Sequence, residues 1–319
     1  MDVPVSAPRA QETSDPALLP IAEAARLLAA RKLSAVELTR ACLRRIEDYD
    51  GQVNAFITVT GELALEQAAA ADRDIAAGRY RGPLHGIPFA VKDIIDTAGI
   101  LTSAHSRILE SNRPAADATA IARLYEAGAV LLGKLATHEF AHGGPSFDLP
   151  WPPARNPWNP EHHSGGSSSG SGAAVASGFT AAALGTDTGG SIRTPASLCG
   201  IVGLKPTYGR VSRHGVINNS YTFDNCGPMT WTVEDCALLL RAIAGFDPKD
   251  ATSSDAPVPD YTAALTPDLK GMRIGVLRHF WEEDLPVSSD VREGLQTACW
   301  QYVFKNVVPR LASLSRFGV

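Results

Sequence analysis

Cysteine is scarce in this sequence, and long apolar runs are missing. The chain has 319 residues and five cysteines, and none of the five forms a CxxC pair. An odd cysteine count without that spacing indicates neither a disulfide framework nor a cysteine zinc site, so a reducing cytoplasm is the simplest setting. No apolar run approaches the roughly 20 residues that cross a bilayer. Residues 1–16 also lack the apolar core of a secretory signal.

A large excess of charge of one sign is absent as well. The formal net charge is −5, which indicates neither a nucleic-acid nor a membrane-surface partner. Hydrophobic residues make up 45% and charged residues 20%, the balance of a soluble globular protein. The length allows one large domain or two ordinary ones, each with a sizeable core.

Apolar periodicity predicts short helices and strands that alternate along the chain. Ser34 and Glu37 form a capping-box pattern at the start of one helix. We find no repeat and no domain linker, and the alternation predicts an α/β layered fold with a largely buried sheet. Helices are expected over 21–30, from 34, over 62–77 and 117–127, from 173, over 232–244 and from 290; strands over 55–59, 87–91, 129–132, 181–184 and 272–277; and a long loop over 143–164.

Two glycine- and serine-rich stretches lie near the middle of the chain. In TDTGGSIR, residues 186–193, two glycines allow a tight turn that brings several N–H groups together, as an oxyanion requires. Ser191 would be the nucleophile of such a turn, pinned by Asp187 and Arg193. The alternative is a loop that only needs glycine. GGSSSGSG, residues 165–172, is either a flexible linker or a bend that brings hydroxyls into one pocket.

Lys92 follows an apolar run that we expect to be a buried strand. A lysine there is either paired, for example with Asp93, or used in chemistry. A serine nucleophile needs a base, and a lysine can serve if burial lowers its pKa from about 10.4 toward roughly 7–8. Ser167 could relay the proton between Lys92 and Ser191.

These stretches together resemble the amidase signature family. The resemblance rests on residues 165–212, from GGSSSGSG through DTGGSIR to GLKPTYGRVS, and on LHGIPFAVKDIIDTAG at residues 84–99. It implies an α/β fold with a mixed, twisted β-sheet core covered by helices on both faces. It also implies a cis peptide bond between Gly166 and Ser167, an amidase activity, and neither a cofactor nor a metal.

The same resemblance assigns the site residues. It implies a catalytic triad of Lys92, Ser167 and Ser191, and an oxyanion hole made by the N–H groups of Thr188, Gly189, Gly190 and Ser191. Ser168, Asp187 and Arg193 are implied as supporting residues. The partner would be a small-molecule amide, with a possible homodimer and no direct contact with nucleic acid or membrane.

Two alternatives remain open at this point. The A subunit of glutamyl-tRNA amidotransferase shares the motif and would need partner subunits. Family members also run longer, and the sequence after Glu293 contains no acidic residue, so a shortened and catalytically defective homologue is the second alternative. We therefore expect a flexible tail over 1–15, an incomplete amidase signature domain over 16–293 and an atypical tail over 294–319.

Histidine offers one competing motif. His138 and His142 match the H-E-x-x-H string of zinc proteases, but a helical setting and a third ligand are required, and glycines follow at once. His162 and His163 precede the serine-rich stretch, and we expect them to shape that loop rather than bind a metal.

Overall fold

A computed structural model describes residues 15–266, 275–285 and 287–306. It divides into a large unit that ends at Thr262 and a small unit that begins at Ala263. Among the helices of the described residues, none is both long and apolar enough to cross a membrane.

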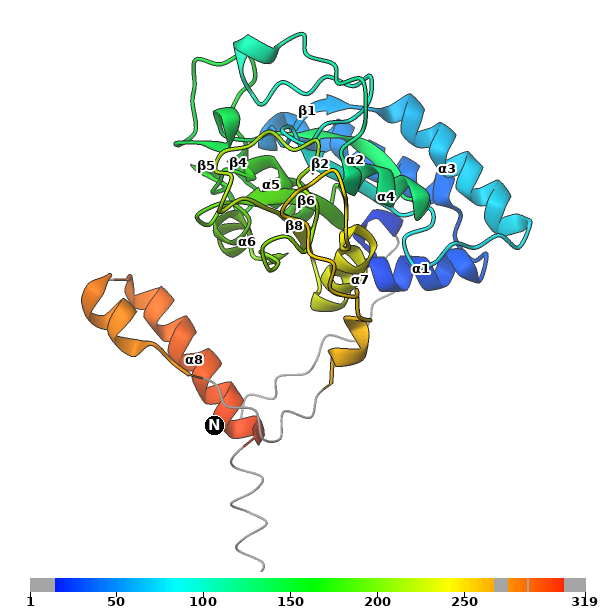
Figure 1. Ribbon diagram of the computed structural model, residues 1–319. Helices are drawn as coiled ribbons and strands as arrows, with labels where there is room; N and C mark the ends of the chain where they lie inside the picture. The colour runs from blue at the N-terminus through cyan, green and yellow to red at the C-terminus, as the bar shows by residue number, and fades with distance from the viewer. Residues whose placement is uncertain (1–14, 267–274, 286, 307–319) are drawn as a thin grey trace, which may run out of the picture. The chain divides into compact units, whose positions relative to one another are not determined.

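A six-stranded mixed sheet forms the centre of the large unit (Figure 1). Its strand order is β1-β3-β2-β6-β8-β7. β2 runs parallel to both β3 and β6, whereas the outer pairs are antiparallel. The carboxyl ends of three central strands therefore meet at one edge, which is where ligands bind in open α/β sheets. The strands are β1 (Phe56–Val59), β2 (Pro88–Lys92), β3 (Val130–Leu135), β6 (Ala182–Asp187), β7 (Val202–Gly203) and β8 (Asn225–Thr230).

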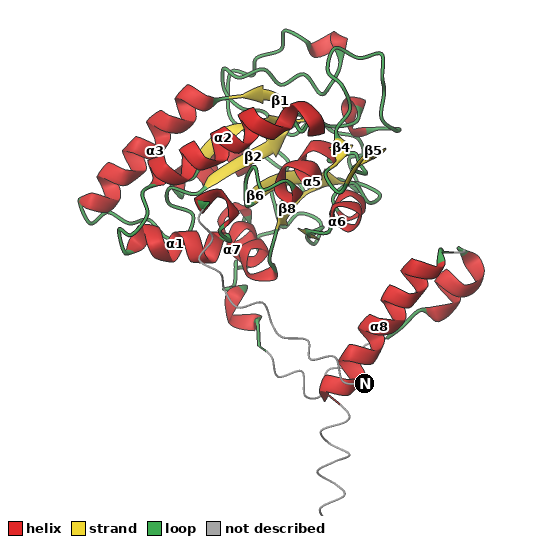
Figure 2. Cartoon of the chain, turned by 180° about the vertical axis from the view of Figure 1, so that it is seen from behind, coloured by secondary structure: helices red, strands yellow, loops and turns green. Residues whose placement is uncertain are grey.

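Helices cover both faces of this sheet. In Figure 1 α4 lies in front of the sheet, and in Figure 2, which shows the opposite side, α2 does. Every residue of β2, β3, β6 and β8 is buried, because neighbours cover both of their faces. The helices of the large unit are α1 (Ile21–Ala29), α2 (Ala35–Val53), α3 (Gly61–Ala76), α4 (Thr119–Glu126), α5 (Ser169–Ala176), α6 (Arg193–Cys199) and α7 (Val233–Ile243). Short 3₁₀ turns lie at Pro16–Leu18, Arg107–Leu109, Glu139–Ala141 and Thr262–Ala264.

Local sequence explains the limits of α2. The hydroxyl of Ser34 accepts the N–H of Glu37 and the Glu37 carboxylate accepts the N–H of Ser34, so the expected capping box is confirmed. Asn54 ends the helix in the left-handed conformation. The carboxylate of Asp50 then accepts the N–H groups of Ala55 and Phe56, which directs the chain into β1.

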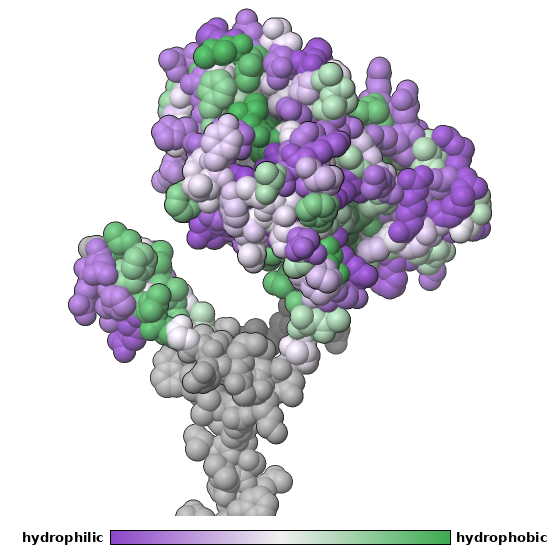
Figure 3. All heavy atoms as spheres, viewed as in Figure 1, coloured by the Kyte–Doolittle hydropathy of each residue, from purple (hydrophilic) through white to green (hydrophobic). Residues whose placement is uncertain are grey.

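Helix α3 packs against the rest of the large unit through a face made mostly of alanine. Its buried positions are Ala64, Ala68, Ala71 and Ile75, at the spacing of a single helical stripe. The small side chains let the helix pack closely, and the surface over α3, at the right of Figure 3, is mainly hydrophilic.

Several expected elements differ from the structure. The expected loop over 143–164 contains a small hairpin, β4 (Arg155–Asn156) with β5 (Asn159–His163). The helix expected from residue 173 begins at Ser169, inside the serine-rich stretch. Three elements were not expected, namely β7, α6 and β8. The β8 sequence NCGPMT contains glycine and proline, which argue against a strand unless its neighbours impose one.

Parts of the expected domain scheme lie outside the described residues. This applies to the N-terminal tail apart from Asp15 and to residues 307–319. It also applies to residues 272–274 of the strand expected over 272–277, and the described remainder, residues 275–277, is not a strand. In the small unit, the helix expected from residue 290 is α8 (Ser289–Asn306), preceded by a π-helical turn at Phe280–Asp284. α8 thus extends through residues 294–306, where we expected an atypical tail.

Candidate active site

Lys92 is the last residue of β2, and it has no contact with solvent. Its Nζ lies 2.7 Å from Oγ of Ser167 and 2.8 Å from Oγ1 of Thr186. The expected contact between lysine and relay serine is therefore present, and Thr186 is an additional neighbour. The alternative partner, Asp93, points elsewhere and forms a buried ion pair with Lys134 at 3.4 Å.

Burial determines the charge of Lys92. Removal from water lowers the pKa of this lysine to about 7, although the charges of Asp187, Asp224 and Cys226 act in the opposite direction. At neutral pH a large fraction of the molecules therefore holds a neutral amine that can accept a proton.

The serine-rich stretch, residues 165–172, is not a flexible linker, because it leads into the buried helix α5. The peptide bond between Gly166 and Ser167 is cis, as expected. The carbonyl of Ser167 accepts the N–H of His138 at 3.1 Å. The residues of α5 from Ser169 to Val175 are all buried, and a Cβ at Gly170 would lie 2.4 Å from both the N of Ala136 and the O of Ala55. Glycine is thus required for this close approach.

Ser168 joins α5 to β6. Its Oγ donates to the carbonyl of Thr186 and accepts the N–H of the same residue, both at 3.1 Å. Its own N–H donates to the carbonyl of Ser191 at 3.1 Å. The residue predicted as supporting therefore ties the relay serine to the strand below it and to the turn that carries Ser191.

The turn that carries Ser191 is built around the carboxylate of Asp187. That carboxylate accepts the N–H of Gly190 at 2.8 Å, the N–H of Ile192 at 3.2 Å and Nε of Arg193 at 2.9 Å. Burial alone would raise the pKa of Asp187, but these hydrogen bonds outweigh it and hold the pKa at about 2. Asp187 is therefore anionic at any working pH and keeps the turn closed, with Ser191 partly accessible to solvent.

The hydrogen bond from the N–H of Gly190 bears on which N–H groups are available for the expected oxyanion hole. An N–H that already donates to Asp187 is turned away from a substrate oxygen. Within the described part of the chain, the N–H groups of Thr188, Gly189 and Ser191 have no acceptor. Of the four donors expected from the sequence, the N–H of Gly190 is thus engaged within the turn, and the other three N–H groups remain candidate donors.

Sequence reasoning missed four residues around the site. Thr186 contacts Lys92, and the ring of His138 packs on Gly166, where a Cβ would lie 2.3 Å from Nε2. Nζ of Lys205 donates to the carbonyl of Thr188, and Asp224 accepts the hydroxyl of Thr188. Thr186 and Lys205 lie within the quoted motifs, but the direction of a side chain cannot be read from a motif.

The zinc-protease string does not have the setting that it requires. His138 and His142 flank a single 3₁₀ turn, Glu139–Ala141, and are not on one face of an α-helix. Nδ1 of His138 lies 2.9 Å from the carbonyl of Gly143. Over the residues that the structure describes, no group of three or more His, Cys, Asp or Glu side chains could hold a metal ion.

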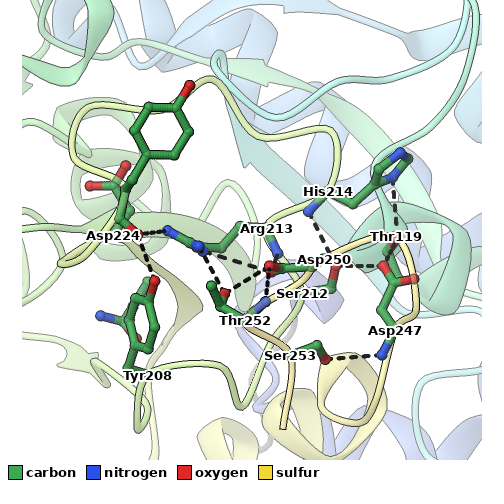
Figure 4. A network of polar contacts seen from close by, with 12 residues as sticks. Thr119, Tyr208, Ser212, Arg213, His214, Asp224, Asp247, Asp250, Thr252 and Ser253 are labelled. Atoms are coloured by element: carbon green, nitrogen blue, oxygen red, sulfur yellow. Dashed lines mark hydrogen bonds and ion pairs between the residues drawn. The ribbon is translucent and has the colours of Figure 1, made fainter.

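A polar network holds the segment that follows the GLKPTYGRVS stretch (Figure 4). Ser212 and Thr119 both donate to the carboxylate of Asp247, and the N–H of Arg213 donates to Asp250 at 2.7 Å. Burial raises the pKa of Asp247, but the hydrogen bonds from Ser212 and Thr119 outweigh this and lower it to about 2. The network thus fixes this segment against the start of α4.

Comparison with known proteins gives a consistent result. A family profile described as Amidase matches residues 37–301. The A subunit of the glutamyl-tRNA(Gln) amidotransferase from Geobacter metallireducens is 54% identical over 272 residues, which are 85% of this chain and 56% of that protein. The corresponding protein of Chloroflexus aurantiacus is 53% identical over 84% of this chain and 55% of that protein. The chain thus spans about half the length of the curated relatives it matches.

Solved structures agree with the sequence relatives. The native peptide amidase of Stenotrophomonas maltophilia has 43% identity and a TM-score of 0.73, over 77% of this chain and 52% of that chain. The A subunit of the glutamyl-tRNA(Gln) amidotransferase from Thermotoga maritima has 40% identity and a TM-score of 0.65, over 76% and 50%. A bacterial aryl acylamidase has 32% identity and a TM-score of 0.72, over 77% and 51%.

Proposed function

This chain belongs to the amidase signature family, and we propose that it hydrolyses a carboxylic amide to an acid and an amine or ammonia. The observation that carries the proposal is the buried Lys92, whose Nζ lies 2.7 Å from Oγ of Ser167. A lysine with a pKa of about 7 next to a hydroxyl is a general base poised for use near neutral pH.

Acylation of Ser191 is the first proposed step. Neutral Lys92 takes the proton of Ser167 as Ser167 takes the proton of Ser191, and Oγ of Ser191 bonds to the amide carbon. The C–N bond then breaks as the leaving nitrogen receives a proton from Ser167, and the Lys92 ammonium returns its own proton to Ser167. The base is thereby neutral again, and the acyl group remains on Ser191 as an ester.

Hydrolysis of the ester repeats the relay with water. Water gives its proton to Ser167 and attacks the acyl carbon, and Ser191 leaves with the returned proton. In both steps the carbonyl oxygen becomes an oxyanion, for which the N–H groups of Thr188, Gly189 and Ser191 are the proposed donors. Loss of one such donor costs about 3–4 kcal/mol of transition-state stabilisation in a comparable enzyme.

A second candidate is the A subunit of a glutamyl-tRNA amidotransferase. Identities of 53–54% with relatives of that kind favour it. This candidate predicts glutaminase activity that depends on partner subunits. Co-purification of the chain with such subunits from the source cells, and activation by them, would support it over the simple amidase. Amide hydrolysis by the purified chain alone, without stimulation, would favour the simple amidase.

Covalent labelling tests the site without knowledge of the substrate. A fluorophosphonate probe should label the purified chain at Ser191, as located by mass spectrometry, and Ser191→Ala should remove both labelling and amide hydrolysis. Lys92→Ala should abolish hydrolysis and Ser167→Ala should strongly reduce its rate. Circular dichroism checks that both variants fold. Unlabelled wild-type protein that is folded would contradict the proposal and favour a defective homologue.

A further inference from the structure

The segment after β7 brings a lysine side chain to the turn that carries Ser191. Its backbone is fixed, because the N–H of Leu204 donates to the carbonyl of Pro228 at 3.1 Å and Pro206 is buried. From this base, Nζ of Lys205 donates to the carbonyl of Thr188 at 2.7 Å and lies 3.6 Å from the carboxylate of Asp187. The Lys205 side chain is 24% exposed, so most of its length is packed against protein.

The contact with Thr188 also determines where an N–H group points. The carbonyl of Thr188 and the N–H of Gly189 belong to the same planar peptide unit. In a trans peptide these two groups point in opposite directions, so a carbonyl held toward Lys205 holds the N–H of Gly189 toward the other side. A charged donor on the carbonyl also polarises the peptide unit, which strengthens the N–H as a donor.

The flanks of this peptide unit are restrained as well. The hydroxyl of Thr188 donates to Asp224, whose carboxylate also accepts the N–H groups of Asn219 and Ser220 at 2.7 and 2.9 Å. On the other side, the N–H of Gly190 donates to Asp187. The N–H of Gly189 lies between these two fixed points and has no acceptor within the described chain.

We propose that Lys205 is a positioning residue that holds the N–H of Gly189 ready to stabilise the oxyanion beside Ser191. The inference rests on the proposed function, because it needs a reaction that forms an oxyanion there. An N–H that is useful only in the transition state should change kcat and leave KM almost untouched. Loss of the Lys205 ammonium should therefore slow the chemical step without weakening substrate binding.

The test compares Lys205→Met and Lys205→Arg with the wild type. Two readouts are used: the rate of Ser191 labelling by a fluorophosphonate, whose phosphoryl oxygen also needs the oxyanion donors, and kcat and KM for p-nitrophenyl acetate. Methionine keeps the apolar stem, so the fold should persist while labelling and kcat fall roughly 10- to 100-fold. KM should stay within about twofold, and arginine, which restores a charged donor, should recover most of the rate.

Matched variants separate the possible outcomes. Lys249→Met removes an exposed ammonium outside the site and should leave both rates unchanged. If Lys205→Met does not fold, Lys205→Gln serves instead, since it keeps a neutral donor and should give an intermediate loss. If the wild type is active and the folded Lys205→Met protein keeps the same kcat, this inference alone is overturned. The same holds if Lys205→Met changes only KM. A folded wild type that neither labels nor hydrolyses the ester overturns the proposed function and the inference with it.

Discussion

At the scale of single residues, the site depends on an amine that has been removed from water. Lys92 gains hydroxyl neighbours in Ser167 and Thr186 but no carboxylate within hydrogen-bond distance in the described structure. Its nearest sequence neighbour, Asp93, is instead paired with Lys134. Because Asp93 pairs with Lys134 and not with Lys92, no adjacent carboxylate among the described residues holds Lys92 in its charged form, and Lys92 stays available as a base.

The pH dependence of activity follows from this lysine. The pKa of Lys92 is about 7 in the folded protein, and only the neutral amine can accept a proton. The rate of Ser191 acylation should therefore rise through pH 7 and reach a plateau above it. A pH–rate profile of kcat/KM for an amide or an activated ester checks this. A rate that stays constant from pH 5 to 9 would contradict the assignment of Lys92 as the base.

The same buried lysine should lower the stability of the folded protein. The pKa of Lys92 is lowered on folding from 10.5 to about 7, so below pH 7 the folded protein carries the full cost of a buried cation. Lys92→Met should abolish activity and raise the free energy of unfolding at pH 7 by on the order of a few kcal/mol.

The control for this prediction is how the extra stability of Lys92→Met changes with pH. Between pH 7 and 10.5 the unfolded state binds more protons than the folded state, so the wild type gains stability as the pH rises. The advantage of Lys92→Met should therefore shrink by about 1.4 kcal/mol per pH unit in that window. Urea unfolding at pH 7 and 9 measures it, and an advantage that does not change with pH would argue against a buried cation.

At the scale of elements, the start of α5 is placed by close packing of small residues. Gly170 lies against the backbone of Ala136, at the end of β3, and of Ala55, before β1. Ser168 then ties the same helix start to β6. A glycine- and serine-rich sequence is therefore the means by which Ser167 approaches Lys92, since larger side chains would hold the helix away from the sheet.

A methyl group at Gly170 should disturb this packing. Gly170→Ala would bring Cβ to within 2.4 Å of two backbone atoms, and we expect a loss of about 1–3 kcal/mol in stability together with slower labelling of Ser191. Gly51→Ala is the matched control, because Gly51 lies in α2 with open space around it and should gain roughly 0.5–1 kcal/mol. Equal effects of the two substitutions in thermal unfolding would contradict the packing argument.

At the scale of the whole molecule, the three residues of the proposed relay and nucleophile all belong to the large unit. Lys92, Ser167 and Ser191 all precede Thr262, where that unit ends. The chain also spans only 56% of the length of the matched amidotransferase protein from Geobacter metallireducens. Because the proposed relay belongs to the large unit, we expect its chemistry to be separable from the small unit.

Removal of the small unit tests this separation. A chain that ends at Thr262 should keep labelling of Ser191 by a fluorophosphonate to within about twofold, because the hydrogen bonds around the relay and the nucleophile turn are all retained. Labelling kinetics and melting temperature of the shortened and full chains provide the comparison. Loss of labelling in a shortened chain that still folds would mean that residues 263–319 contribute to the site.

The sequence by itself determined the family and the layered α/β class, and it predicted the relay residues that we propose here. Those conclusions depend on local patterns: apolar periodicity, the capping box at Ser34 and the motif around Ser191. Most helix and strand positions in the first half of the large unit follow from the same signals, because each needs only neighbouring residues.

Only the tertiary structure decided which groups face one another. The N–H of Gly190 donates to Asp187, and Nζ of Lys205 donates to the carbonyl of Thr188. Neither contact can be read from the motif. β8 forms although its glycine and proline oppose it, because β6 and β7 flank it on both sides. Such long-range pairings depend on the position of the whole sheet, and no local pattern in the chain contains that information.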